Sequence, residues 1–429
     1  MSKTYELDPY GMKWMGEVPG RWSVEPAKRH FDIQLGKMLQ NDPSCDTDRI
    51  VPYFKALHVL WGAVNARDLP EMWASPSELR QYGLVSGDLL VCEGGEVGRA
   101  GIVTTPPRDS IIQNALHRVR AKNSGDVRFL MYVLHSVSSA GWFDVLCNKA
   151  TIAHFTGEKF ASLRIPLPPN DEQQAIADFL DRETGRIDAL IEKKQRQIEL
   201  LQEKRTALIS HAVTKGLDPN AKMKDSGIEW LGEIPKHWEV RRLKYTADLI
   251  NQKVDGAESD LPYMGLEHIE SWTGKRLGQN GDASSDGQAN LYGRGDVLFG
   301  KLRPYLAKAH AAKIDGICTG ELLVLRPKTV KQKFLLNYVL NPDFVAIVDS
   351  STYGAKMPRA NWEFIGNLPA LIPPMHEQQA IADFLDRETA RIDALIEKVQ
   401  SSIAMLRKYR TALISAAVTG KIDVRKEVA

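Results

Sequence analysis

The segment EQQAIADFLDRETGRIDALIEK, residues 172–193, recurs almost unchanged as EQQAIADFLDRETARIDALIEK at residues 377–398. The two copies differ at one position, which is Gly185 in the first and Ala390 in the second. Self-similarity at a fixed separation indicates repeated structural units, so this repeat is the first feature to interpret. It predicts that the chain contains the same element twice.

A second repeat precedes each copy of the first. WMGEVPGRW at residues 14–22 recurs as WLGEIPKHW at residues 230–238, whereas the stretches that follow these two motifs show little resemblance to each other. The repeated segments therefore form two near-identical frames, and each frame carries a different insert. Two equal frames suit two equal partners, and two different inserts suit two different ligands. The segments predicted on this basis are 1–22, 23–166 (first insert), 167–222 (helical), 223–240 (repeated motif), 241–371 (second insert) and 372–429 (helical).

Long helices are predicted after the breakers PLPPN at residues 166–170 and LIPP at residues 371–374. Each breaker is followed by a segment without proline that is rich in Ala, Leu, Ile, Glu, Lys, Arg and Gln. Seam positions with the 4–3 spacing of a coiled coil are Ile187, Ile191, Lys194, Ile198, Leu201, Arg205, Leu208 and Ala212, and Ile392, Ile396, Val399, Ile403, Leu406, Arg410, Leu413 and Ala417. Because neither helix has a helical neighbour in sequence, we expect the two to pair with each other in an antiparallel coiled coil with an internal pseudo-twofold.

Arg205 and Arg410 interrupt the two seams at matching positions, each within the repeated RTALIS. Either their stems pack while their charged heads reach solvent, or each pairs with a carboxylate and fixes the register of the helices.

The length of the predicted helices can be compared with DNA. Residues 187–212 would extend roughly 39 Å at about 1.5 Å per residue. That length is on the order of 11 base pairs of DNA.

The inserts have the pattern of mixed domains. Apolar runs follow Gly-Asp turns in SGDLLVCEGGEVGRAGIV from Ser86 and RGDVLFGKLRPYLAKAHAA from Arg294, which is typical of strands. Short helices are predicted at residues 128–136 and 332–340. The fold class is therefore α+β, with two mixed α/β domains joined by two long helices.

Local basic clusters are the predicted DNA contacts, because the formal charge of the whole chain is only +2. Lys, Arg, Asn, Thr and His side chains on loops can reach phosphates and base edges. The candidates in the first insert are Arg99, Arg118, Arg120, Lys149, Thr151 and His154. The candidates in the second insert are Lys301, Arg303, Tyr305, Lys308, Lys356, Arg359 and Asn361.

Catalytic motifs are not recognisable in the sequence. Asn341-Pro-Asp-Phe only partly matches the Asn/Asp-Pro-Pro-aromatic loop of adenine methyltransferases, and the glycines at 94, 95 and 98 do not form a GxGxxG cofactor turn. Four separated cysteines suggest neither a disulfide framework nor a zinc site. No stretch has the length of a membrane helix, so a cytoplasmic location is expected.

The order of these parts resembles the specificity subunit of type I restriction–modification enzymes. The resemblance rests on WMGEVPGRW and WLGEIPKHW, GDVLFGKLRPYLAK, TYGAKMPRANW, PPNDEQQAIADFLD and PPMHEQQAIADFLD, and RTALIS with AVTKG. It implies that each insert is a target recognition domain for half of a bipartite, asymmetric site on double-stranded DNA. It also implies that the helices are a spacer that docks two adenine methyltransferase (M) subunits, which use S-adenosylmethionine, and that restriction/translocase (R) subunits join the complex.

The chain itself is then expected to be non-catalytic and to bind no cofactor or metal. Repeated aromatic residues are interpreted as core anchors or docking residues, and the predicted docking set is Trp14, Trp22, Trp230, Trp238, Phe179 and Phe384. Two other functions remain open at this point. One is a coiled-coil interaction scaffold without DNA specificity, which the divergent basic inserts fit poorly, and the other is a fused enzyme, which lacks its cofactor motif.

Overall fold

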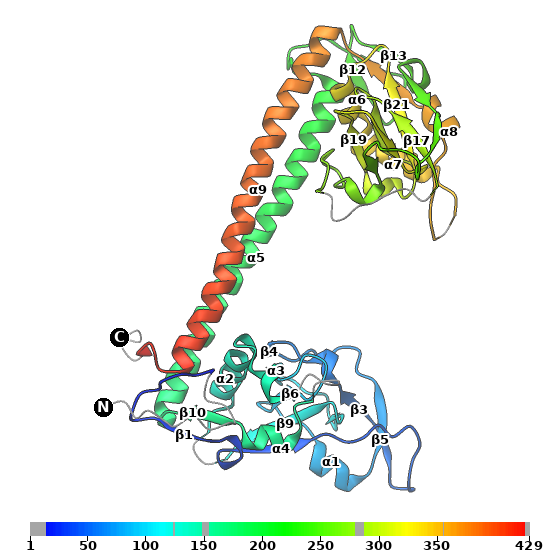
Figure 1. The fold of residues 1–429 in the computed structure, drawn as a ribbon. Helices are drawn as coiled ribbons and strands as arrows, with labels where there is room; N and C mark the ends of the chain where they lie inside the picture. Colours follow the sequence, from blue (N-terminus) through cyan, green and yellow to red (C-terminus); the bar gives the residue numbers. More distant parts are fainter. Residues whose placement is uncertain (1–13, 123–124, 148–153, 279–286, 355, 425–429) are drawn as a thin grey trace. The chain divides into compact units, whose positions relative to one another are not determined.

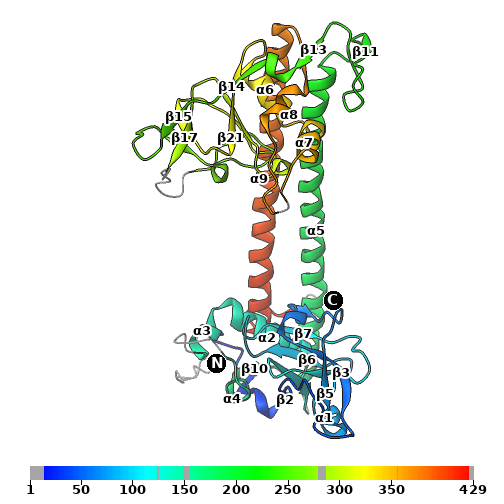
Figure 2. The ribbon, with the colours of Figure 1, turned by 90° about the vertical axis from the view of Figure 1, so that its right-hand side faces the viewer.

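The computed structural model describes residues 14–122, 125–147, 154–278, 287–354 and 356–424. The chain divides into two compact units (Figures 1 and 2). Unit 1 comprises Met1–Lys194 and Ser401–Ala429, and unit 2 comprises Gln195–Gln400. Each unit therefore contains one insert together with parts of both long helices.

Unit 1 is built on a five-stranded and a three-stranded sheet. The five-stranded sheet has the order β2 (Phe31–Leu35), β9 (Leu116–Ala121), β6 (Leu89–Cys92), β7 (Ala100–Ile102), β4 (Gly62–Ala63). The three-stranded sheet has the order β5 (Glu71–Ala74), β3 (Arg49–Phe54), β8 (Ile111–Ile112), and a separate pair joins β1 (Ser23–Pro26) to β10 (Arg164–Leu167). The short helices are α1 (Pro76–Tyr82), α2 (Val127–Ser139), α3 (Trp142–Leu146) and α4 (Gly157–Ser162), with 3₁₀ turns η1 (Ala27–Arg29) and η2 (Ala56–His58).

Unit 2 has two four-stranded sheets. Their orders are β14 (Ala247–Ile250), β21 (Leu322–Pro327), β18 (Val297–Gly300), β19 (Ala309–Ala311), and β15 (Lys253–Asp255), β17 (Gln288–Tyr292), β20 (Gly316–Cys318), β16 (Tyr263–Met264). Two separate pairs join β13 (Glu239–Arg242) to β22 (Pro369–Ile372) and β11 (Met223–Asp225) to β12 (Glu233–Pro235). The short helices are α6 (Gln332–Val339), α7 (Pro342–Ser350) and α8 (Trp362–Asn367), with 3₁₀ turns η3 (Leu243–Tyr245), η4 (Leu266–His268) and η5 (Pro304–Leu306).

The two inserts share one plan despite their dissimilar sequences. In each, a strand and a 3₁₀ turn lead into the sheet and a buried central strand follows. Three short helices and a closing strand then lead to a long helix. The central strands β6 and β18 are buried throughout, because every residue of LLVC and VLFG is apolar or glycine. Both inserts are therefore mixed α+β domains, as predicted.

The Gly-Asp signal marks an equivalent turn in both units. Gly87 has a φ of +92°, and the Asp88 carboxylate accepts a hydrogen bond from the Val85 N–H at 2.8 Å. The Asp296 carboxylate likewise accepts from the Gly293 N–H at 2.8 Å before β18. Each turn directs the chain into a buried strand, which is the structure that its sequence predicts.

The two long helices are α5 (Asn170–Lys215) and α9 (Met375–Val418). In unit 1, Leu180 near the start of α5 shares a hydrophobic core with Ile414 near the end of α9. In unit 2, Ile209 near the end of α5 shares a core with Ile381 near the start of α9. Each unit thus encloses the first turns of one long helix and the last turns of the other.

Candidate nucleic-acid interface

Two basic loops of unit 2 that the sequence analysis selected are joined to each other. Residues 301–307 follow β18, and residues 353–360 precede α8. The Arg303 N–H donates to Pro358 O at 2.8 Å, and an isolated β-bridge between Leu302 and Arg359 adds to this connection. We call residues 301–307, 353–354 and 356–360 the loop pair of unit 2.

The loop pair of unit 2 presents cationic and aromatic side chains to solvent. Arg303, Lys356 and Tyr305 are exposed, and Lys301 is half-buried. Tyr353, which is 63% exposed, and Met357, which is 48% exposed, are additional candidates that residue type alone did not select. Cations beside flat apolar groups can bind phosphates and base edges.

Unit 1 joins two loops at the equivalent place with different residues. The loop that follows β6, residues 93–98, is linked to the segment before α4 because the Phe155 N–H donates to Glu93 O at 2.8 Å. His154 is exposed and its imidazole lies beside Gly94. We call residues 93–98 with 154–155 the loop pair of unit 1. Of the other candidates here, Lys149 and Thr151 lie outside the described residues.

Several predicted DNA contacts belong instead to the fold, which corrects the sequence analysis. Arg118 is 5% exposed, and its Nη1 donates to the carbonyls of Gln81 and Gly83. Arg120 forms a bidentate ion pair with Asp88, at 2.6 and 2.8 Å. Both side chains stabilise the strand β9. Arg118 is too buried to reach DNA, whereas the Arg120 side chain is 37% exposed beside its carboxylate partner.

Four further candidates are also held by neighbouring groups. Arg99 binds Glu96 at 2.7 Å and the Ala56 carbonyl at 3.0 Å. The guanidinium of Arg359 binds both carboxylate oxygens of Glu321. The Lys308 ammonium donates to Leu266 O at 2.7 Å, and the exposed Asn361 caps α8 by accepting from the Phe364 N–H at 2.8 Å. Arg99, Lys308 and Arg359 are therefore assigned to positioning the loop pairs.

Most of the predicted docking residues are core residues, which is a second correction. Trp14, Trp22, Trp238 and Phe179 are each at most 8% exposed, while Trp230 and Phe384 are half-buried against the core of unit 2. The indole N–H of Trp22 donates to Glu172 at 3.2 Å, and that of Trp238 donates to Glu377 at 2.9 Å. The sequence repeat therefore preserves an internal bond between each tryptophan motif and the first turn of its long helix.

Exposed apolar side chains recur instead on the outer faces of the long helices. Leu190 and Leu395 occupy the same repeat position and are 43% and 42% exposed. Leu200 and Met405 share another repeat position and are 50% and 71% exposed. Each unit thus presents one exposed apolar residue of each pair, which makes these positions the better candidates for partner docking.

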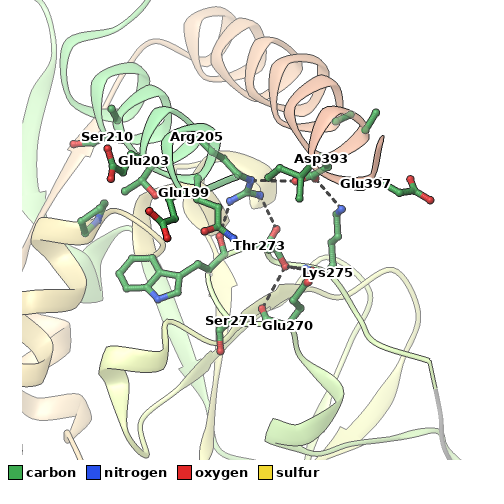
Figure 3. Close-up of a pocket in the computed structure, with 18 of the residues that line it drawn as sticks. Glu199, Glu203, Arg205, Ser210, Glu270, Ser271, Thr273, Lys275, Asp393 and Glu397 are labelled. Carbon is green, nitrogen blue, oxygen red and sulfur yellow. Dashed lines mark hydrogen bonds and ion pairs between the residues drawn. The ribbon is translucent and has the colours of Figure 1, made fainter. Parts of the chain in front are cut away.

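The seam arginines pair with carboxylates of the opposite helix, as one of the two predictions required. In unit 1, Arg410 of α9 binds Asp188 of α5 through two hydrogen bonds of 2.9 and 3.1 Å. In unit 2, Arg205 of α5 lies 3.6 Å from Asp393 of α9 (Figure 3). The two ion pairs join equivalent positions of the repeat, and each fixes the local register of the two helices.

The family model for the type I restriction modification DNA specificity domain matches residues 79–200 and 235–404. The chain belongs to this family. The two matched ranges lie largely in different units, and each joins part or all of one insert to the long helix that follows it. We call each insert with its helix a specificity domain.

Relatives and solved structures agree with this family. The type I restriction enzyme EcoDI specificity subunit of Escherichia coli is 22% identical over 64% of this chain and 66% of that one, just under two thirds of its length. The putative type I restriction enzyme MjaX specificity subunit of Methanocaldococcus jannaschii is 24% identical over 98% of both chains. A chain solved in work on complex assembly and conformational transition of the type I R-M system gives a TM-score of 0.71 at 16% identity, covering 94% of this chain and 99% of that one. The HsdS subunit from Thermoanaerobacter tengcongensis gives 0.54 at 17% identity over 94% and 98% of the two chains. At these identities the two structures support the fold alone.

The described residues of the two specificity domains contain no group of three or more His, Cys, Asp or Glu side chains that could hold a metal ion. Among the same residues, no helix is long and apolar enough to cross a membrane.

A half-buried histidine gives the first specificity domain a predicted pH dependence. His135 of α2 contacts Arg410 and packs edge-on against Trp61, and burial, followed by the positive charge of Arg410, lowers the pKa of His135 to about 4. A histidine with a lowered pKa in the folded state destabilises the fold as the pH drops below its ordinary value of 6.5, because the unfolded chain binds the proton more readily. The stabilisation present at pH 7.5 should fall by about 2 kcal/mol at pH 5 through this group.

Thermal unfolding of the wild type and of His135→Gln at the two pH values measures this effect. Glutamine can still accept a hydrogen bond from Arg410 but does not titrate, so the variant should lose less stability on acidification than the wild type. The difference between the two proteins isolates His135 from other groups that titrate in the same range. Equal losses would show that His135 does not carry the effect.

Proposed function

We propose that this chain is the sequence-reading subunit of a type I restriction–modification enzyme and that it recognises a bipartite, asymmetric site on double-stranded DNA. The observation that carries this proposal is the equivalence of the two loop pairs. They occupy the same place in two domains of the same plan, yet their residues differ: residues 93–98 carry EGGEVG, whereas residues 301–307 carry KLRPYLA. Equivalent positions with different side chains suit the reading of two different base sequences.

The long helices act in this proposal as a spacer. The Arg410–Asp188 pair in unit 1 and the matching Arg205–Asp393 pair in unit 2 support an antiparallel coiled coil with an internal pseudo-twofold. A stiff helix pair would set the gap between the half-sites. A scaffold without DNA specificity is not favoured, because the family model and the curated relatives all concern DNA specificity proteins.

Two adenine methyltransferase subunits are the proposed partners, and R subunits complete the restriction form. A surface that occurs twice should bind the same partner twice. The apolar sets that support this are Leu190 with Met405 in unit 1 and Leu395 with Leu200 in unit 2. The methyltransferase supplies the S-adenosylmethionine site and the catalysis, and this chain supplies neither.

Native mass spectrometry of the chain with saturating methyltransferase tests the stoichiometry. We expect two methyltransferases per wild-type chain, because the docking surface is present in both units. Leu190→Asp with Met405→Asp should leave one, and Leu200→Asp with Leu395→Asp should also leave one. Combining all four substitutions should leave none, because a buried, unpaired carboxylate opposes association at each surface.

Circular dichroism provides the control for these variants, since all four side chains are exposed in the chain alone. Helix content should not change. A one-to-one complex of the wild type, or two bound methyltransferases in the fourfold variant, would contradict the proposed docking.

A further inference from the structure

Both specificity domains contain a tryptophan loop of the same construction. Each loop follows a 3₁₀ turn that ends in histidine, η2 or η4, and each is closed by an isolated antiparallel bridge. We call residues 59–64 of unit 1 and residues 269–276 of unit 2 the tryptophan loops. Trp61 lies in the first and Trp272 in the second.

In unit 2, a long-helix arginine holds the backbone of the tryptophan loop. Arg205 is 8% exposed, and it donates from Nη1 to Trp272 O at 2.6 Å and from Nη2 to Thr273 O at 3.3 Å. The ammonium of Lys275, in the same loop, binds Asp393 at 2.7 Å (Figure 3). The loop is therefore tied to α5 through Arg205 and to α9 through Lys275.

The same loop supports the loop pair that we assign to DNA reading. The Trp272 N–H donates to Ala307 O at 3.0 Å, at the end of residues 301–307. Both residues have left-handed backbones, with φ of +65° for Trp272 and +44° for Ala307. Non-glycine residues keep this conformation only where their surroundings hold it. Arg205, on one side of Trp272, thus supports a strained connection that leads directly to residues 301–307. We call residues 301–307 of unit 2 and residues 93–98 of unit 1 the reading loops.

Unit 1 makes the equivalent connection with other side chains. Arg410 donates from Nη1 to His135 Nε2 at 3.4 Å, and the His135 ring packs edge-on against Trp61 with 4.9 Å between centroids. The Trp61 indole N–H donates to Glu96 at 2.7 Å. Glu96 lies in residues 93–98, the counterpart of residues 301–307.

Arg205 and Arg410 occupy the same position of the repeat. In each domain this arginine is connected to the equivalent reading loop, but through different contacts. We infer that Arg205 and Arg410 are positioning residues that hold each reading loop at a fixed place on the helix pair, so that the complex accepts one gap length between the half-sites. This inference rests on the proposed function. It assigns to the arginines a role in specificity, in addition to the register of the helices.

Binding of the full complex to duplexes with altered gaps tests the inference. The chain with its methyltransferases is titrated against the recognised site and against sites with the gap lengthened or shortened by one base pair. The wild type should prefer the natural gap by at least about 100-fold, on the order of the cost of a mismatched base pair or two. Arg205→Met keeps the buried stem and removes the donors, so it should reduce this preference by about tenfold or more.

Matched variants make the result specific. Arg410→Met should act like Arg205→Met, and Arg205→Lys should retain part of the preference. Arg196→Met removes an exposed ion pair with Glu199 from the same helix and should leave the preference unchanged. If Arg205→Met does not fold, Asp393→Asn keeps the carbonyl contacts of Arg205 and should give an intermediate loss of gap preference.

Two outcomes would overturn the inference. If the folded Arg205→Met and Arg410→Met complexes lose affinity by the same factor at every gap length, the two arginines have a purely structural role. If these complexes keep both the affinity and the full gap preference of the wild type, the arginines do not position the loops. Failure of the wild-type complex to bind any specific site would refute the proposed function instead, so the two failures are distinguishable.

Discussion

Exchanging residues 23–166 for the corresponding domain of a related specificity protein is expected to change one half-site, or sequence block, of the methylated site completely. The other block and the gap should stay the same. The exchange points are favourable because Ser23 of β1 and Leu167 of β10 are direct partners in an antiparallel pair, so the domain enters and leaves the frame at one place. Each mismatched base pair costs about 1–3 kcal/mol, so a block of three or more base pairs should lose its original identity by a factor on the order of a thousand or more.

Mapping of methylated adenines in cells that contain the exchanged chain and its methyltransferase gives this result directly. The reciprocal exchange of residues 241–371 is the control and should change the opposite block. A change in both blocks after either exchange, or in neither, would contradict independent reading by the two domains.

Replacing Lys301, Arg303 and Lys356 by alanine is expected to weaken specific DNA binding by about 100-fold. These cations lie in the loop pair of unit 2. Cations that contact phosphates reduce affinity for all sequences when removed and lower the salt slope by about one unit each. A base-reading arginine relaxes one position of the site at a cost of about 1–3 kcal/mol.

Titrations at several salt concentrations, with methylation mapping of the single variants, separate these roles. Lys328→Ala is the matched control, because Lys328, directly after β21, is exposed and paired with Asp248 of β14. It should change affinity by less than about twofold, as is usual for an exposed ion pair. Unchanged affinity and methylation pattern in the triple variant would remove this loop pair from the DNA interface.

The repeat and its periodicity predicted the helices well because helix-forming composition and breakers act locally. The short helices expected at residues 128–136 and 332–340 are observed as α2 and α6, and the long helices begin directly after the proline breakers. The seam positions of Arg205 and Arg410 were also sufficient to suggest carboxylate partners. What the sequence could not supply was the choice among the available carboxylates, because Asp188 and Asp393 are far away along the chain.

Basic residues were the weakest guide to the site. Arg118 and Arg120 looked like a surface cluster, but alternate residues of a strand share one face. That face meets the Gly83 carbonyl and the Asp88 carboxylate. Whether a cation is neutralised in this way depends on contacts that are distant in sequence. For the same reason, the tryptophan loops became visible only once the fold had brought them to the helices.

The repeated tryptophans left a core and a docking interpretation open for a related reason. A large aromatic residue at a repeated position satisfies the pattern of a core as well as that of an interface, and the buried indole of Trp238 shows that the core interpretation is right there. The exposed apolar positions, such as Leu190 and Leu395, carry no such signal because single leucines are common on helices.

Selection of bound duplexes from a random-sequence library, with the purified chain and its methyltransferase, tests the central claim most directly. We expect the enriched sequences to contain two short, different blocks separated by a constant number of unspecified base pairs, with about one turn of DNA between block centres. A single continuous or palindromic motif, or no enrichment at all, would contradict a chain that reads two half-sites with two specificity domains.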